Sequence, residues 1–283
     1  MYKIIDGNAI SKKILEELRN RINVLNVTGK NRVLYDIVVG DDPASEIYIN
    51  NKIKKFHDMS IKFELVKLPA EITEKELLDK IEELNNNKNA NAIFVELPLP
   101  KQINELNIID KINPKKDVDG FSKMSLGALF QNNKGFYPCT AEGIAELIDR
   151  SNISVESKNL VVVGRSNIVG KPVALLMLNR NATVTICHSK TNGLREICKN
   201  ADILIVAIGK PNFIDDTYIK DGAVVIDAGI NRIEVDGVKK VCGDVDVEKV
   251  ANHTSYITPV PGGVGPMTVT MLIKHCVETI DYE

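Results

Sequence analysis

The sequence predicts an α/β fold of two domains, an N-terminal α/β domain and a second α/β domain with a mostly parallel sheet. Strand-like and helix-like runs alternate along nearly the whole chain, which is the pattern of a parallel sheet covered by helices. The chain has 283 residues, enough for two modest domains. The alternation breaks between residues 113 and 140, where Pro, Asn and Gly cluster. We therefore place the domain boundary near residue 137.

Helix signals and apolar runs define the elements of the first domain. Apolar residues at helical spacing predict a helix over 10–25. Pro43 is typical of a first helical position, and Thr73 with Glu76 has the spacing of a capping box, so each indicates a further helix. The apolar runs between these helices predict strands, and shorter helices follow them. The strands are expected at 33–40, 61–69 and 91–100, and the short helices at 103–112 and 124–130.

The second domain repeats the alternation and ends in a loop rich in glycine and proline. That loop leads into a C-terminal helix within 255–275. The strands that precede it are expected in 159–170, 182–189, 201–209 and 222–231.

Composition excludes several classes of protein. A formal net charge of -2 gives no overall electrostatic attraction for nucleic acid or an anionic membrane. No apolar run approaches the length of a membrane-spanning helix, and the N-terminus does not resemble a secretory signal. The 5 cysteines are scattered, without the spacing of a zinc site, so we expect reduced thiols, no metal and a cytoplasmic protein.

The stretch VVVGRSNIVG, residues 161–170, has the order strand, tight loop and helix of a Rossmann-type dinucleotide site. Gly164 allows a sharp turn, Ser166 is small enough for close approach, and the helix N-terminus offers free N–H groups to a phosphate. The spacing departs from GxGxxG, so a turn without any ligand is the alternative. Arg165 would then be a solvated loop residue.

The next strand favours NADP over NAD. NAD enzymes usually place an acid about 20 residues after the fingerprint, where it binds the ribose 2′-hydroxyl. Here the strand ends in His188, Ser189 and Lys190, with no acid. Arg165 and Ser189 suit a 2′-phosphate instead. The alternative for His188 is a histidine at the end of the strand that has no role in binding a ligand.

A tyrosine and a lysine four residues apart predict a second site. Tyr48 and Lys52 share one helical face, with Ser45 one turn earlier. An aromatic ring beside an amine suits a flat substrate that exchanges a proton. The alternative is an amphipathic helix with a half-buried Tyr48 and a solvated Lys52.

Two irregular segments and one acid complete the candidate residues. DVDG, residues 117–120, is either an ordinary turn or a segment that offers one carboxylate to the N–H groups of a heterocycle. PVPGGVGPMT, 259–268, is a fixed loop at a strand end, where α/β sheets bind ligands. Glu96 interrupts the apolar run NAIFVELPLP, and a buried acid requires a partner.

A series of motifs in this order resembles the bifunctional methylenetetrahydrofolate dehydrogenase/cyclohydrolase family over nearly the whole chain. GRSNIVGKP and PGGVGPMT are the most specific of them. The series consists of YxxxK after DDPAS, LPLP after a strand, KDVDGF, GRSNIVGKP, CHSKT, DAGIN and TPVPGGVGPMT.

The resemblance implies the roles of the two domains. A folate-binding catalytic domain would comprise 1–137 and 266–283, so that the C-terminal helix returns to the first domain. Residues 138–265 would form a Rossmann NADP-binding domain, with a folate cleft between the two. Hydride would pass from 5,10-methylenetetrahydrofolate to the nicotinamide. Water would then open the methenyl cation to 10-formyltetrahydrofolate.

The resemblance also implies roles in the folate site. Tyr48 would stack on the folate ring system, and Lys52 would be the central catalytic amine. Ser45 would support Lys52 by a hydrogen bond. Asp119 would anchor the pterin, whereas Asp117 would be structural.

The resemblance further implies a cofactor site. Gly164, Arg165 and Ser166 would hold the phosphates, Ser189 would lie near the 2′-phosphate, and Ile230 would border the nicotinamide.

The loop at Pro261, Gly262 and Gly263 would line the junction of cofactor and folate. The family also implies a homodimer that acts in one-carbon metabolism and purine biosynthesis.

Glu96 departs from the family, in which this strand usually reads VQLPLP. The family Gln hydrogen-bonds the catalytic lysine, so Glu96 is expected to face Lys52, although a solvent-facing position is the alternative. Lys52 would then hold its proton more firmly. Either hydrolysis becomes slow and leaves a monofunctional dehydrogenase, or Glu96 itself takes the proton from water while Lys52 orients it.

Two other classes of protein compete with this interpretation. One is a different two-domain NADP-dependent dehydrogenase that acts on a hydroxy or keto acid. It would not need Tyr48, Lys52 and the PGGVGPMT loop together. The other is a non-catalytic nucleotide-binding or regulatory subunit, which would need neither the lysine nor the tyrosine.

Overall fold

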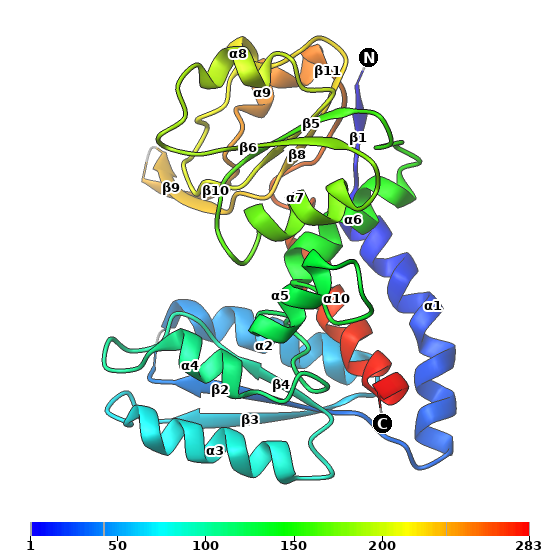
Figure 1. The fold of residues 1–283 in the computed structure, drawn as a ribbon, viewed down its shortest axis with the longest axis vertical. Helices are drawn as coiled ribbons and strands as arrows, with labels where there is room; N and C mark the ends of the chain where they lie inside the picture. The colour runs from blue at the N-terminus through cyan, green and yellow to red at the C-terminus, as the bar shows by residue number, and fades with distance from the viewer. Residues whose placement is uncertain (1, 42, 236, 283) are drawn as a thin grey trace. The chain divides into compact units, whose positions relative to one another are not determined.

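The computed structural model describes two compact units (Figure 1). Met1–Lys12 and Thr140–Thr268 form unit 1, and Lys13–Cys139 and Val269–Glu283 form unit 2. The described residues are 2–41, 43–235 and 237–282, except for the side chains of Pro43, Ala44, Ser45, Ile47, Val235 and Val238.

Unit 1 is built on a six-stranded parallel sheet in the order β1-β11-β8-β7-β5-β6. The central strands β7 and β8 are buried along their whole length, as expected for parallel strands with both faces covered. The strands are β1 Lys3–Ile4, β5 Asn159–Val163, β6 Thr183–Cys187, β7 Ile203–Val206, β8 Ala223–Asp227 and β11 Thr254–Ile257.

Helices and a hairpin join these strands. The antiparallel hairpin of β9 and β10 follows β8 (Figure 1). Its strands are β9 Asn231–Val235 and β10 Val238–Cys242, and the helices are α6 Cys139–Arg150, α7 Gly170–Leu178, α8 Leu194–Cys198 and α9 Val247–Val250.

Unit 2 is built on a three-stranded parallel sheet in the order β3-β2-β4. Its strands are β2 Val33–Val39, β3 Lys62–Leu68 and β4 Ala92–Val95. Its helices are α1 Gly7–Val27, which begins in unit 1, α2 Pro43–Asp58, α3 Glu74–Asn86, α4 Glu105–Lys111, α5 Lys123–Phe130 and α10 Gly265–Glu278.

Helices α2 and α3 cover opposite faces of the three-stranded sheet. Ile37 of β2 lies in one hydrophobic cluster with Leu77 and Ile81 of α3. Asp36, the preceding residue, contacts Lys52 of α2. Since successive strand residues point to opposite faces, α2 lies on the face away from α3. The face of the three-stranded sheet that α2 covers therefore carries the polar contact between Asp36 and Lys52.

The C-terminal helix belongs to unit 2, as predicted. His275 of α10 is buried, and its Nδ1 donates a hydrogen bond of 2.7 Å to the carbonyl of Val118. The Phe136 ring centroid lies 5.2 Å from that of His275. These contacts attach the helix to the segments that flank α5.

The predicted α/β architecture is confirmed, with some elements that the sequence did not reveal. Thr73 and Glu76 form the predicted capping box of α3, and α2 begins at Pro43. The short strand β1 and the β9–β10 hairpin were not predicted. Because β1 pairs with β11, Met1–Lys12 falls in unit 1, whereas the expected boundaries assigned these residues to the other domain.

Among the described residues, no helix combines the length and apolar character needed to cross a bilayer.

Lys116 provides a test of how α3 ends. Its amine donates hydrogen bonds to the carbonyls of Leu84, Asn85 and Asn87 at 3.0, 2.7 and 2.9 Å. The last carbonyls of a helix have no partner within it, so the amine satisfies them. We expect Lys116→Met to lower the free energy of unfolding in urea by about 1 to 3 kcal/mol. The exposed neighbour Lys115→Met is the control, and an equal effect of both changes would contradict this assignment.

Candidate functional site

The centre of the candidate site in unit 2 is a buried lysine between two acids. Lys52 lies on α2 and its side chain is 0% exposed. Its Nζ donates a hydrogen bond of 2.8 Å to Oδ2 of Asp36 and a second one to Oε1 of Glu96. Two carboxylates in contact with the amine favour its charged form, the ammonium.

Aromatic rings complete the surroundings of the ammonium. The Lys52 Nζ lies 3.9 Å from the ring centroid of Phe94 on β4 and 5.3 Å from that of Tyr48. Both distances suit a cation–π contact. Tyr48 and Lys52 thus lie together, as their spacing predicts, and Tyr48 remains 41% exposed. Its burial, followed by the charges of Glu96 and Asp119, raises the pKa of the Tyr48 hydroxyl.

Asp36 is the member of this cluster that the sequence did not reveal. It lies within β2, and its side chain is 0% exposed. Its Oδ1 is the one buried side-chain N or O atom in the described part of the chain that has no hydrogen-bond partner. Burial raises the pKa of the Asp36 carboxyl to about 7, with Lys52 lowering it and the charge of Glu96 raising it further.

Glu96 has the partner that its position requires. It follows β4 directly, and its backbone N–H donates to the carbonyl of Ile37 at 2.9 Å. Its carboxylate contacts the Lys52 ammonium, which is the expected pairing. Its side chain is 15% exposed, whereas the side chains of Lys52 and Asp36 are 0% exposed. Glu96 is therefore the member of the three that solvent can reach.

The two acids of DVDG differ in their surroundings. Asp117 is buried and accepts hydrogen bonds from the N–H groups of Gly120 and Ser122 and from the Ser125 hydroxyl, which fits its predicted structural role. Asp119 is half-buried and lies close enough to Lys52 for their charges to interact. Burial, followed by the charge of Asp117, raises the pKa of Asp119 to about 8. Asp119 thus presents a largely protonated carboxyl at neutral pH.

The predicted support of Lys52 by Ser45 concerns a side chain outside the described part of the structure.

The nucleotide-binding loop of unit 1 joins β5 to α7 through two closely packed glycines. Gly164 has φ +141°, and a Cβ there would lie 2.3 Å from the Ala207 carbonyl oxygen. A Cβ on Gly170 would lie 2.3 Å from the Gly164 carbonyl oxygen. Ser166 Oγ accepts the N–H groups of Val169 and Gly170 at 3.1 and 3.2 Å. The glycines are thus required for the turn, although the spacing is not GxGxxG.

A pocket of about 250 Å³ lies at the carboxyl ends of β5, β6 and β7. Open α/β sheets bind ligands at this edge, where the strand order reverses. The pocket brings together Gly164, Arg165, His188 and Ser189, so the residues at the ends of two strands meet as predicted. No acid of the described chain lines it. Its remaining lining residues are Val163, Leu194, Ala207, Ile208, Lys210 and Phe213.

A buried acid holds one wall of this pocket in place, and no sequence pattern indicated it. Asp244 accepts the backbone N–H groups of Ile208, Gly209 and Lys210 at 2.7, 3.0 and 2.8 Å. Its Oδ1 also accepts from the Asn231 side chain at 2.9 Å. These bonds fix the loop that follows β7. The contact depends on the folded loop, because Asp244 is distant from residues 208–210 in the chain.

The residues predicted near the nicotinamide lie in unit 1. Ile230 is 66% exposed, which suits a side chain that meets a ligand. Gly262 has φ +104°, and its carbonyl accepts the Asn8 N–H at 3.2 Å. A Cβ on Gly263 would lie 2.6 Å from the Pro259 carbonyl oxygen. The loop with Pro261 is therefore closely packed.

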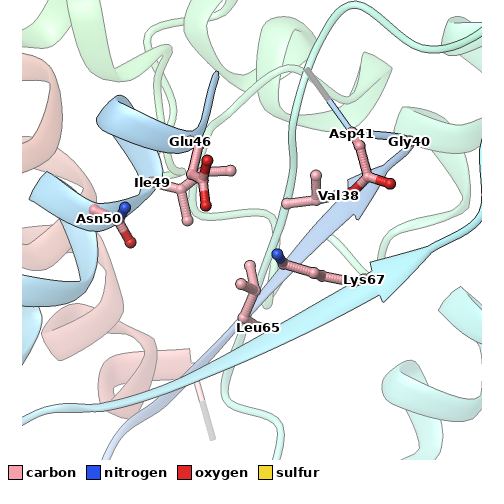
Figure 2. A pocket seen from close by; sticks show the side chains of 8 residues that line it. All are labelled: Val38, Gly40, Asp41, Glu46, Ile49, Asn50, Leu65 and Lys67. Atoms are coloured by element: carbon pink, nitrogen blue, oxygen red, sulfur yellow. The ribbon is translucent and has the colours of Figure 1, made fainter. Parts of the chain in front are cut away.

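A small pocket lies beside α2, near the carboxyl ends of β2 and β3 (Figure 2). It is lined by Val38, Gly40, Asp41, Glu46, Ile49, Asn50, Leu65 and Lys67. Its volume is about 140 Å³. Pockets for small molecules usually measure about 300 to 1,000 Å³. None of the residues around Lys52 lines it, so this pocket is separate from the candidate site.

A parallel sheet with a tight glycine loop and a pocket at its ligand-binding edge, joined to a second α/β unit with a buried lysine, is the arrangement of a two-domain dinucleotide-dependent enzyme. The chain belongs to the tetrahydrofolate dehydrogenase/cyclohydrolase family. The catalytic domain of that family matches residues 5–119, and its NAD(P)-binding domain matches residues 138–283.

Relatives match over nearly their whole length. The chain is 54% identical over 280 residues to the bifunctional protein FolD of Agathobacter rectalis, covering 99% of both chains. It is 50% identical to the FolD of Bacillus cereus, covering 98% of this chain and 96% of the relative.

Solved structures agree with this result. The bifunctional FolD of Campylobacter jejuni has a TM-score of 0.97 and 42% identity, covering 100% of this chain and 99% of that one. The methylenetetrahydrofolate dehydrogenase-cyclohydrolase of Trypanosoma brucei, complexed with NADP and an inhibitor, has a TM-score of 0.94 and 34% identity, covering 99% of this chain and 98% of that one.

Gly170 tests the nucleotide-binding loop. Gly170→Ala would place a methyl group 2.3 Å from the Gly164 carbonyl oxygen, so the loop must move. We expect the Kd for NADP, measured by calorimetry, to rise at least about tenfold. Gly127→Ala is the control, because a Cβ there meets no atom within 4 Å. Unchanged NADP affinity in Gly170→Ala would contradict the assignment of this loop.

Proposed function

We propose that this chain is an NADP-dependent methylenetetrahydrofolate dehydrogenase and methenyltetrahydrofolate cyclohydrolase that acts in one-carbon metabolism. The observation that carries the proposal is the Lys52 ammonium held between Asp36 and Glu96. Family membership over both domains supports the two activities. The pocket at Gly164, Arg165 and Ser189, with no acid among its described lining residues, supports NADP.

The dehydrogenase step depends mainly on positioning. Hydride moves directly between two carbon atoms, so the protein has to align the folate with the nicotinamide. The exposed part of Tyr48 offers a face on which the folate ring system stacks. Asp119, whose pKa is raised to about 8, can donate or accept a hydrogen bond at the pterin.

The cyclohydrolase step requires a base for the attacking water. Lys52 is an ammonium with a side chain that is 0% exposed, so it does not accept this proton. Glu96 is 15% exposed and carries a carboxylate that reaches solvent. We assign Glu96 as the base and Lys52 as the charge that orients it. This assignment keeps both activities rather than leaving a monofunctional dehydrogenase.

The cofactor roles follow the same proposal. Gly164, Arg165 and Ser166 hold the phosphates, Ser189 lies near the 2′-phosphate, and Ile230 borders the nicotinamide.

The remaining roles concern support of the site. Ser45 supports Lys52 through a hydrogen bond, and Pro261, Gly262 and Gly263 line the junction of cofactor and folate.

The domain roles, assembly and location complete the proposal. Residues 1–137 with 266–283 bind folate, and 138–265 bind NADP. The enzyme is a cytoplasmic homodimer whose 10-formyl product serves purine biosynthesis. The resemblance in sequence supports these statements.

The wild-type enzyme and Glu96→Gln test the function together. With methylenetetrahydrofolate and NADP⁺, we expect the wild type to form NADPH while methenyltetrahydrofolate is consumed faster than in buffer. A general base contributes about 10²- to 10⁴-fold, so Glu96→Gln should slow methenyl hydrolysis by about 100-fold or more. Dehydrogenation should change by no more than about threefold, since it depends on positioning.

The exposed Glu71→Gln serves as the matched control. Faster hydrolysis in Glu96→Gln would mean that Glu96 suppresses this step. A wild type without either activity would contradict the proposed function.

Ser189 tests the choice of cofactor. An acid at this position repels a 2′-phosphate and accepts from a 2′-hydroxyl, as in NAD enzymes. A charge-assisted hydrogen bond is worth about 1.5 to 3 kcal/mol, so Ser189→Asp should raise the KM for NADP about 10- to 100-fold and lower that for NAD. Thr185→Asp, an exposed change on the preceding strand β6, is the control. Equal effects of both changes would contradict the assignment.

A further inference from the structure

Asp36 is a buried acid in contact with the candidate site, and the resemblance gives it no role. We infer that Asp36 is a positioning residue of the cyclohydrolase step: its ionised carboxylate holds the Lys52 ammonium, which leaves Glu96 free to accept the proton of the attacking water. This inference rests on the proposed function and deepens it.

The geometry gives one ammonium two competing acceptors. Asp36 Oδ2 accepts from Lys52 Nζ at 2.8 Å, and Glu96 accepts from the same nitrogen. When Asp36 is neutral, Glu96 is the only anion in contact with the ammonium, and the whole attraction of the ammonium falls on its carboxylate. When Asp36 is ionised, the ammonium is shared by two anions. The Glu96 carboxylate is then held less tightly and is available to the attacking water.

Exposure separates the roles of the two acids. The side chains of Asp36 and Lys52 are 0% exposed, so water does not reach them, whereas Glu96 is 15% exposed. A proton taken from water by Glu96 can leave directly to solvent. Asp36 has no direct contact with solvent, and its Oδ1 has no hydrogen-bond partner among the described residues. Asp36 therefore acts through Lys52 and does not touch the substrate.

The proton and the charge balance without another reactant. The water oxygen bonds to the methenyl carbon, one O–H bond breaks, and its proton moves to the Glu96 carboxylate. The cation becomes a neutral adduct. The bond from this carbon to N5 then breaks as the hydroxyl proton moves to N5, which gives the 10-formyl product. Glu96 releases its proton to solvent.

The charged and titratable groups around Asp36 determine when it ionises. Lys52 and Tyr48 face it from α2, and Glu96 faces it from the segment after β4. Opposite Asp36, the neighbouring strands β3 and β4 place only the apolar residues Leu65 and Phe94. Burial raises the Asp36 pKa to about 7, so the cluster of Asp36, Lys52 and Glu96 changes from net neutral to net negative near neutral pH.

Asp36→Asn tests the inference through the pH profile of methenyl hydrolysis. In the wild type we expect the rate to rise through about pH 7 as Asp36 ionises. The variant should lose this rise, with a rate at least about tenfold lower at pH 8 and within about threefold of the wild type at pH 6. The KM for methenyltetrahydrofolate should stay within about threefold, because Asp36 does not touch it. A merely structural role would lower the rate by the same factor at both pH values.

Thermal unfolding gives a second readout that does not depend on activity. A carboxyl whose pKa is raised in the folded state stabilises the fold while it is protonated. This contribution is lost as the pH rises from 3.8, the usual pKa of the carboxyl, towards about 7. The Tm of Asp36→Asn relative to wild type should therefore increase between pH 5 and pH 8. The exposed Asp58→Asn is the control and should show neither effect.

The outcomes separate this inference from the proposed function. A wild type that hydrolyses methenyltetrahydrofolate, together with an Asp36→Asn profile of the same shape, would overturn the role of Asp36 alone. A wild type that does not hydrolyse it would overturn the proposed function itself.

Discussion

The buried ammonium of Lys52 is the constraint on which the catalytic half of the protein depends. A buried charge is very costly unless it is paired, and breaking such a pair leaves an uncompensated charge. Asp36 supplies the pairing from β2 and Glu96 from the position directly after the adjacent strand β4, so the sheet register and the position of α2 are fixed together. Of the two acids in this pairing, Glu96 has access to water and Asp36 does not, and the roles proposed for them follow from this difference.

The cofactor half depends on close backbone packing rather than on charge. Gly164 and Gly170 allow the backbone of the loop after β5 to pack closely against Ala207 and against itself. Asp244 holds the loop after β7 through three backbone N–H groups. The pocket at the ends of these strands presents Arg165 and Lys210. These two cations suit a phosphate-bearing ligand.

Local patterns predicted much of the fold, whereas contacts distant in sequence limited the prediction of the site. The capping box of Thr73 and the spacing of Tyr48 and Lys52 are local, and both are found as predicted. Asp36 was missed because a single acid in VLYDIVV does not reveal which helix covers its face of the strand. Asp244 and β1 were missed for the same reason, since their partners are set by the folded loops and by sheet pairing.

Carboxyl-selective ¹³C NMR across pH tests most directly whether two acids share one ammonium. The account predicts one side-chain carboxyl, absent from Asp36→Asn, that titrates near pH 7. In Glu96→Gln its midpoint should fall, because the charge of Glu96 raises the pKa of Asp36. If the Asp36 resonance titrates near the usual value of 3.8, or if its midpoint is the same in Glu96→Gln, the proposed sharing of the ammonium is wrong.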